Sequence, residues 1–206
     1  MAIVVHGGYW RAQYNRSLME GLCVDLAAHG LAAWNLEYRR VGSGGGWPQT
    51  FADAADGLDR LAEIDEPLDL DRVVTIGFSA GAPLALWAAG RGDGAVRPVG
   101  AVNQAGLSDL RASQIVHELL GDPDANPEPY DLANPVDNLP LGIPQLHVHG
   151  DADEQIPVEY SRRFVERARA AGDEAELVVI EGAGHFDHNN PRSAAWRAVT
   201  DWLQRF

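Results

Sequence analysis

Residues 73–81 read Val-Val-Thr-Ile-Gly-Phe-Ser-Ala-Gly, and an apolar helical segment follows at residues 83–89. The β-branched run predicts a buried strand, so the two glycines stand where a strand turns into a helix. A serine hydroxyl is a poor nucleophile unless it is held away from its own backbone and beside a base, and a sharp strand–turn–helix elbow provides the first of these conditions. The pattern therefore predicts that Ser79 is a nucleophile.

Outward from this elbow, short apolar runs alternate with helical patterns along the whole chain, as in crossover units that build a parallel sheet. Most of these runs lack polar alternation, which indicates that helices cover both faces of the sheet. The predicted strands span residues 2–6, 32–38, 72–77, 99–104, 145–149 and 176–181. The expected fold class is α/β, with a mostly parallel central sheet of about six strands in a single domain over residues 1–206.

The helical patterns between these strands carry recognisable end signals. Helices are expected over residues 16–29 and 158–171, and another has Pro48 in its first turn, where a missing N–H group is harmless. In the last helix, Asn190 is the expected cap and Pro191 the expected first residue.

Residues 107–140 break the alternation of strands and helices. They contain several prolines around one short helical segment near residues 108–120. We expect this segment to form a small lid. The alternative is a surface excursion that has no role in substrate binding.

Composition excludes several classes of protein. The net charge is -14, with 16 basic and 30 acidic residues, which disfavours binding to nucleic acid. The only cysteine, Cys23, lies in an apolar helical pattern, so we expect a buried side chain and no internal disulfide. Residues 1–5 leave no room for a secretion signal, and no apolar run reaches the roughly 20 residues that cross a membrane. A cytoplasmic protein without a membrane partner is expected.

Two further motifs follow the last two predicted strands. Residues 149–157 read His-Gly-Asp-Ala-Asp-Glu-Gln-Ile-Pro, and residues 182–186 read Gly-Ala-Gly-His-Phe. A histidine can take the proton of an attacking serine and return it to the leaving group, while a carboxylate fixes the histidine tautomer. His185 is therefore the candidate base, and each acidic residue of the first motif is a candidate for the carboxylate.

The chain order of nucleophile, acid and histidine resembles that of the α/β-hydrolase family, and the resemblance covers nearly the whole chain. Members of this type usually place the acid third after the glycine, which implies Asp153 rather than Asp151 or Glu154. The resemblance thus implies a catalytic triad of Ser79, Asp153 and His185.

A fourth motif, His-Gly-Gly-Tyr-Trp at residues 6–10, follows the first predicted strand. Acyl transfer passes through a tetrahedral oxyanion, which preorganised N–H donors stabilise. In related hydrolases these donors come from such a glycine-rich loop and from the residue after the nucleophile, which implies the backbone N–H groups of Gly8, Tyr9 and Ala80. The motif resembles the loop of kynurenine formamidases and of small carboxylesterases.

Aromatic residues near these motifs are candidates for a substrate pocket. Tyr9, Trp10, Trp47 and Phe78 offer apolar surface for an acyl or aromatic group; the alternative for each is ordinary packing or anchoring of a loop.

The chain departs from the family at its start. A complete α/β-hydrolase has two additional strands before the one that leads to residues 6–10, so the expectation is either a minimal protein or a truncated start. Without that pair, the strand at residues 32–38 becomes an uncovered edge, which invites pairing with another chain. We therefore expect a homodimer or marginal stability.

The motifs favour a serine hydrolase that cleaves a carboxylic ester of a small substrate through an acyl-enzyme. A formamide or other amide, as in kynurenine formamidases, is the second prediction, and a peptide, as in prolyl-oligopeptidase-like enzymes, is the third. No cofactor is implied, because the acyl-enzyme route needs only water as its second substrate.

Two predictions from other classes stay open. Residues 147–153 carry alternating histidines and aspartates, which suggests a metal-dependent hydrolase, but Ala152 stands where metallo-β-lactamase-like sites need a second histidine. A binding protein that keeps the fold and has lost activity is the other alternative.

Overall fold

The computed structural model describes residues 1–206, and one sheet organises all of them. The strand order is β2-β1-β3-β4-β5-β6, and every neighbouring pair is parallel. The strands are β1 (Ala2–Val5), β2 (Ala33–Leu36), β3 (Val74–Phe78), β4 (Gly100–Gln104), β5 (Gln145–Gly150) and β6 (Ala175–Ile180). The predicted six-stranded sheet is confirmed, and each strand lies within a residue or two of its expected place.

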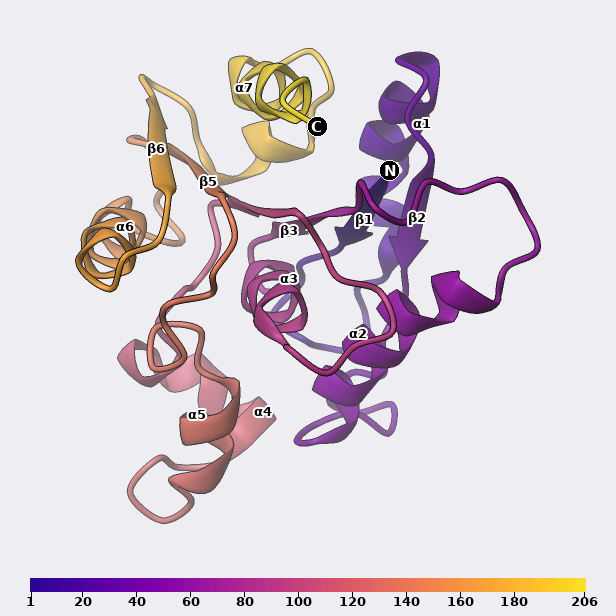
Figure 1. The fold of residues 1–206 in the computed structure, drawn as a ribbon. Helices are drawn as coiled ribbons and strands as arrows, with labels where there is room; N and C mark the ends of the chain where they lie inside the picture. The colour runs from indigo at the N-terminus through magenta and orange to yellow at the C-terminus, as the bar shows by residue number, and fades with distance from the viewer.

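Helices cover both faces of this sheet, as Figure 1 shows. Helices α1 and α7 lie on one face, and α2, α3 and α6 lie on the other. The α-helices are α1 (Glu20–Ala28), α2 (Gln49–Asp59), α3 (Gly81–Gly90), α4 (His117–Leu120), α5 (Glu128–Ala133), α6 (Glu159–Ala170) and α7 (Ala194–Leu203). Short 3-10 helices are η1 (Arg16–Met19), η2 (Arg60–Glu63), η3 (Leu110–Ala112), η4 (Gln114–Val116) and η5 (His185–Asn189).

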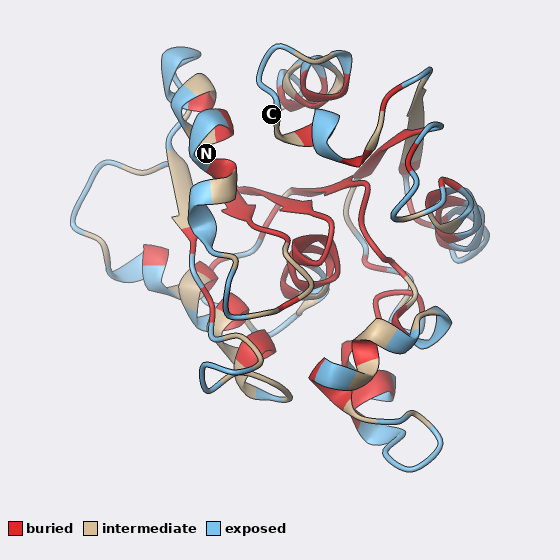
Figure 2. Cartoon of the chain, turned by 180° about the vertical axis from the view of Figure 1, so that it is seen from behind, coloured by how far each residue is buried: buried red, intermediate tan, exposed pale blue.

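The core consists of apolar layers on the two faces of the sheet. Successive strand residues point to opposite faces, so in β1 the side chains of Ala2 and Val4 contact the α1/α7 layer while Ile3 and Val5 contact the α2/α3 layer. Helix α3 is buried almost all round, as its colour in Figure 2 shows. Since α3 begins directly after Ser79 and Ala80, packing in the centre of the core holds the turn between β3 and α3 in place.

Three local expectations were wrong. The last helix begins at Ala194, with Ser193 as the cap, whereas Asn190 accepts a hydrogen bond from the N–H of Arg192 in a turn ahead of the helix. The segment at residues 108–120 forms three short helices, η3, η4 and α4, in place of one. Cys23 is half-buried, because the buried stripe of α1 runs through Leu22 and Leu26 beside it.

Strands β2 and β6 form the two edges of the sheet. Strand β2 is the one that the sequence predicted at an edge. Dimerisation through β2 stays a prediction. None of the helices combines the length and the apolar character that crossing a membrane requires.

Candidate active site

The three residues of the predicted triad come together at the carboxyl edge of the sheet. Ser79 follows β3, Asp153 follows β5 and His185 opens η5 after β6, and in a parallel sheet these strand ends share one edge. His185 Nε2 lies 2.9 Å from Ser79 Oγ, and His185 Nδ1 lies 2.7 Å from Asp153 Oδ2. All three residues are buried. The arrangement is a continuous hydrogen-bonded chain from a hydroxyl through an imidazole to a carboxylate.

The elbow around Ser79 depends on close backbone approaches. A Cβ on Gly77 would lie 2.4 Å from Ala82 Cα, and a Cβ on Gly81 would lie 2.3 Å from Val5 O. Both distances are far shorter than any real contact, so each position admits only glycine. Ser79 itself has a φ of 52°, a conformation that L-residues adopt reluctantly and that turns its hydroxyl out of the elbow.

The geometry singles out one carboxylate near His185. Asp153 Oδ1 accepts the N–H groups of Gln155 and Ile156 at 2.8 and 2.9 Å, which leaves Oδ2 for His185. Burial would raise the pKa of the Asp153 carboxyl, but hydrogen bonds from His149 and His185 outweigh burial and lower that pKa below its ordinary value. Asp151 is exposed and accepts the N–H of Gly182.

The three backbone N–H groups predicted to stabilise an oxyanion have no partner within the protein. The backbone N–H groups of Gly8, Tyr9 and Ala80 donate to no acceptor within the protein, although Ser79 N–H and Arg11 N–H beside them do. Non-glycine residues with positive φ occur only at Tyr9, Trp10, Ser79 and Ala105, all of which follow β1, β3 or β4 at the same edge. Backbone strain in this protein is therefore concentrated around Ser79, as is common at functional sites.

His6 anchors the loop that carries two of these donors. Its Nε2 lies 2.9 Å from Glu37 Oε1, its carbonyl accepts the Tyr38 hydroxyl at 2.8 Å, and its ring stacks on Tyr38 at 4.3 Å. Arg40 completes the cluster with a contact of 2.9 Å to Glu37. The segment at residues 38–40, which had no role in the sequence-based interpretation, thus holds the loop in place.

A cavity of about 190 Å³ opens beside Ser79 and Ala80. Tyr9 and Trp10 line it, and the Tyr9 hydroxyl donates to Gln155 Oε1 at 2.6 Å. The other apolar lining residues are Leu107, Ile115, Ile156, Pro157 and Tyr160, and Ser113 and Gln155 are polar. No charged side chain lines this cavity.

Two residues predicted for the pocket lie elsewhere. Phe78 follows Val74 and Ile76 onto the face covered by α1 and α7, and its ring lies 5.0 Å from that of His185. Trp47 packs edge-on against Phe51, with ring centroids 5.4 Å apart, outside the cavity.

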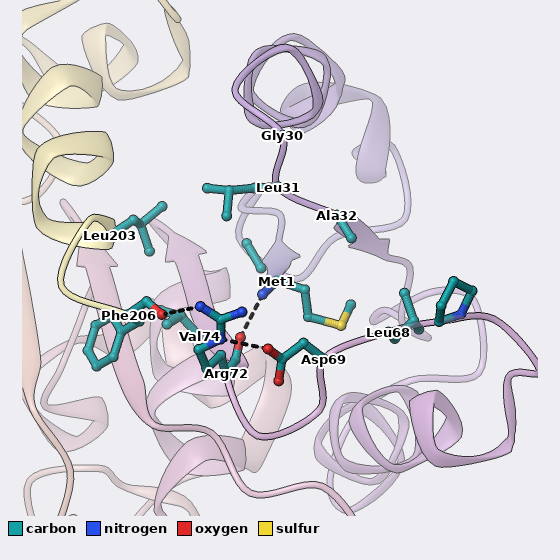
Figure 3. A pocket seen from close by; sticks show the side chains of 12 residues that line it. Met1, Gly30, Leu31, Ala32, Leu68, Asp69, Arg72, Val74, Leu203 and Phe206 are labelled. Atoms are coloured by element: carbon teal, nitrogen blue, oxygen red, sulfur yellow. Dashed lines mark hydrogen bonds and ion pairs between the residues drawn. The ribbon is translucent and has the colours of Figure 1, made fainter.

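A larger cavity, of about 360 Å³, lies at the opposite, amino edge of β1 and β3 (Figure 3). Its polar groups are already paired: Arg72 binds Asp69 and the carbonyl of Phe206, and the Met1 amino group donates to the Arg72 carbonyl. It contains no nucleophile beside a base. The smaller cavity at Ser79 is therefore the candidate active site.

The residues of the metal-dependent alternative do not form a ligand cluster. His147 is buried against Phe164, and His149 contacts Ser161 and the carbonyl of Ile156. No group of three or more histidine, cysteine, aspartate or glutamate side chains is placed to hold a metal ion.

Sequence reasoning missed most of the cavity wall. Gln155 and Ile156 stood in the motif that carries Asp153, so their closeness was a usable signal. Tyr160 and Ile115 come from α6 and η4, and their places in the wall depend on packing that no local pattern reports.

Fold and site together define a protein of the α/β-hydrolase superfamily. The chain belongs to the prolyl oligopeptidase family, whose model (Peptidase_S9) matches residues 10–206. The match leaves out only the first nine residues, which form β1 and the start of the glycine-rich loop.

The individual proteins that this chain resembles share limited sequence identity with it. The esterase LipC of Mycobacterium tuberculosis is 28% identical over 89% of this chain and 52% of its own length. A putative carboxymethylenebutenolidase of Methylorubrum extorquens is 35% identical over 35% of this chain and 28% of its own length. This chain thus spans about half or less of the curated relatives it matches. The solved structure of a truncated carbohydrate esterase from gut microbiota superposes with a TM-score of 0.84 at 20% identity, over 99% of this chain and 84% of that one.

Proposed function

We propose that this protein is a serine hydrolase that cleaves a carboxylic ester of a small, uncharged substrate through an acyl-enzyme. The observation that supports it is the hydrogen-bonded chain from Ser79 through His185 to Asp153, at 2.9 and 2.7 Å, beside free backbone N–H groups. The name of the esterase relative points to the same bond.

Each residue has one task in the proposed reaction. Ser79 Oγ attacks the ester carbonyl while its proton passes to His185 Nε2, and Asp153 stabilises the resulting imidazolium. The carbonyl oxygen becomes an oxyanion, which the N–H groups of Gly8, Tyr9 and Ala80 stabilise. When the oxyanion collapses, the alcohol leaves with the proton from Nε2. Water then repeats the sequence on the acyl-enzyme and releases the acid.

The cavity beside Ser79 limits the substrate in size and charge. An apolar protein cavity of about 150 Å³ holds a benzene molecule, so a cavity of this size suits one compact apolar group rather than a long chain. Because the wall carries no cation, the carboxylate of an anionic substrate would lose its hydration without gaining a partner. The segment predicted to form a lid would also contact the substrate, because its residues Leu107, Ser113 and Ile115 line the cavity.

The test compares p-nitrophenyl butyrate with its laurate ester, with mono-p-nitrophenyl succinate, with N-formylkynurenine and with a prolyl p-nitroanilide. We expect the highest kcat/KM for the butyrate. Higher values for N-formylkynurenine would favour a formamidase. Higher values for the prolyl anilide would favour a peptidase, to which the family name points.

A fluorophosphonate probe separates an enzyme from an inactive binding protein. We expect the probe to label the wild type and the control variant Ser43→Ala, in which an exposed serine outside the cavity lining is replaced, and not to label Ser79→Ala. Esterase activity that survives Ser79→Ala would refute the proposed nucleophile. Folded wild-type protein that takes up no probe would favour the binding alternative.

A further inference from the structure

A second histidine touches the carboxylate of the triad. His149 lies at the end of β5 and is fully buried, and its Nε2 lies 3.4 Å from Asp153 Oδ2. The same Nε2 lies 2.7 Å from the carbonyl of Ile156. His149 therefore contacts both ends of the short segment that holds the acid, and it has no place in the proposed proton transfers.

The contacts of His149 fix where its ring proton lies. The carbonyl of Ile156 and the carboxylate of Asp153 only accept hydrogen bonds, so Nε2 carries the proton. On the other side of the ring, the Ser161 hydroxyl lies 2.7 Å from Nδ1 and has no other partner, so it donates to Nδ1. A hydroxyl on α6 thus selects the tautomer that points an N–H group at the acid loop.

We propose that His149 is a positioning residue for Asp153: its Nε2–H group ties the carbonyl of Ile156 and the Asp153 carboxylate together. The inference rests on the proposed function, because it gives His149 a purpose only if Asp153 orients His185. It adds a connection from Ser161 on α6 to the triad, by which the packing of that helix sets the direction of the carboxylate.

The geometry explains why one N–H group matters here. Asp153 Oδ1 is held by the N–H groups of Gln155 and Ile156, so the carboxylate turns with the loop backbone. Without the His149 donor, the Ile156 carbonyl is buried without its partner, and the loop shifts to satisfy it. A displacement of about 1 Å in a catalytic group can lower the rate about 100-fold.

The chain offers a matched control two residues earlier on the same strand. His147 is equally buried and faces the same side of β5, since alternate strand residues share a face. Its ring packs against that of Phe164, and its Nε2 lies 3.4 Å from Gln145 Oε1; it makes no hydrogen bond to the acid loop. Replacing His147 removes a buried imidazole of the same strand without touching the triad.

The experiment measures kcat and KM of His149→Met, His149→Gln and His147→Met with p-nitrophenyl butyrate. Methionine and glutamine have similar length and volume, but only glutamine retains an N–H donor near the position of Nε2. We expect kcat to fall about 10- to 100-fold in His149→Met with KM within about twofold of the wild type. His149→Gln should recover much of this loss, and His147→Met should resemble the wild type.

Equal kcat in His149→Met and His147→Met would overturn the proposal, and so would equal losses in His149→Gln and His149→Met, since these indicate packing rather than donation. If His149→Met does not fold, Ser161→Ala decides: a severalfold lower kcat at unchanged KM supports the proposal, and an unchanged kcat overturns it. Ser79→Ala is measured in the same assay, because activity in that variant would refute the proposed function itself.

Discussion

Replacing Asp153 by asparagine tests the assignment of the acid at the level of a single atom. Because Asp153 Oδ1 accepts two backbone N–H groups, the oxygen of an asparagine would stay there and its NH₂ group would face His185 Nδ1 at the present 2.7 Å. Nδ1 would then have to accept, which moves the ring proton to Nε2. With that proton in place, His185 cannot take the proton of Ser79.

The expected loss follows from this wrong tautomer. In a serine protease the corresponding change lowers kcat about 10,000-fold, and the same orientation of the amide predicts a similar factor here. The assay is the steady-state hydrolysis of p-nitrophenyl butyrate, with thermal melting to confirm folding. Asp151→Asn is the matched control, since Asp151 lies in the same loop and its carboxylate accepts the N–H of Gly182 rather than a bond from His185. A larger loss in Asp151→Asn than in Asp153→Asn would refute the assignment.

Three other predictions test the loop, the buried imidazoles and the cysteine. Gly8→Ala should lower kcat about 100-fold or more, because φ is +109° there and a Cβ would lie 2.3 Å from Tyr14; steady-state kinetics with near-normal kcat would contradict this. Burial lowers the pKa of His147 and of His188 to about 3, from 6.5. Below about pH 6.5 the unfolded chain therefore binds more protons than the folded protein, so the free energy of unfolding should decrease as the pH falls. Each imidazole should contribute about 1.4 kcal/mol per pH unit to this decrease between pH 6.5 and its folded pKa. Urea unfolding at pH 7 and pH 5 measures this loss of stability, and equal unfolding midpoints at the two pH values would contradict it. Burial raises the pKa of the Cys23 thiol from 9.0 to about 11, so at pH 8 iodoacetamide should label the native protein about 100-fold more slowly than the urea-unfolded chain, and comparable rates would count against this.

The sheet, and the closeness of Ser79 and His185 at one of its edges, could be predicted from the sequence because each of their signals is local. Ser79 and His185 each stand in a glycine-flanked motif directly after an apolar strand, and the parallel order of the strands then places the motifs at one edge. The choice of Asp153 over Asp151 needed the family pattern, since both follow the same strand. Their burial separates them, with Asp153 buried and Asp151 exposed.

The parts that could not be predicted depend on contacts between distant segments. The cavity wall joins Tyr9 to Gln155, 146 positions apart, and takes Tyr160 from α6. Asn190 and Ser193 are both good helix caps, so local propensity does not decide between them. The structure uses Ser193, whose hydroxyl accepts the N–H of Trp196.

Because β6 lies at the edge of the sheet, we expect the segment that carries His185 to open more easily than the segment that carries Ser79. Ser79 sits between central strands and a helix buried in the core, whereas His185 follows a half-buried border strand that has one neighbour. Border segments open at a lower free energy than the centre of a domain. A transient opening there would remove the imidazole while the elbow stays intact, so we expect the proposed esterase activity to be lost on warming before the bulk of the molecule melts.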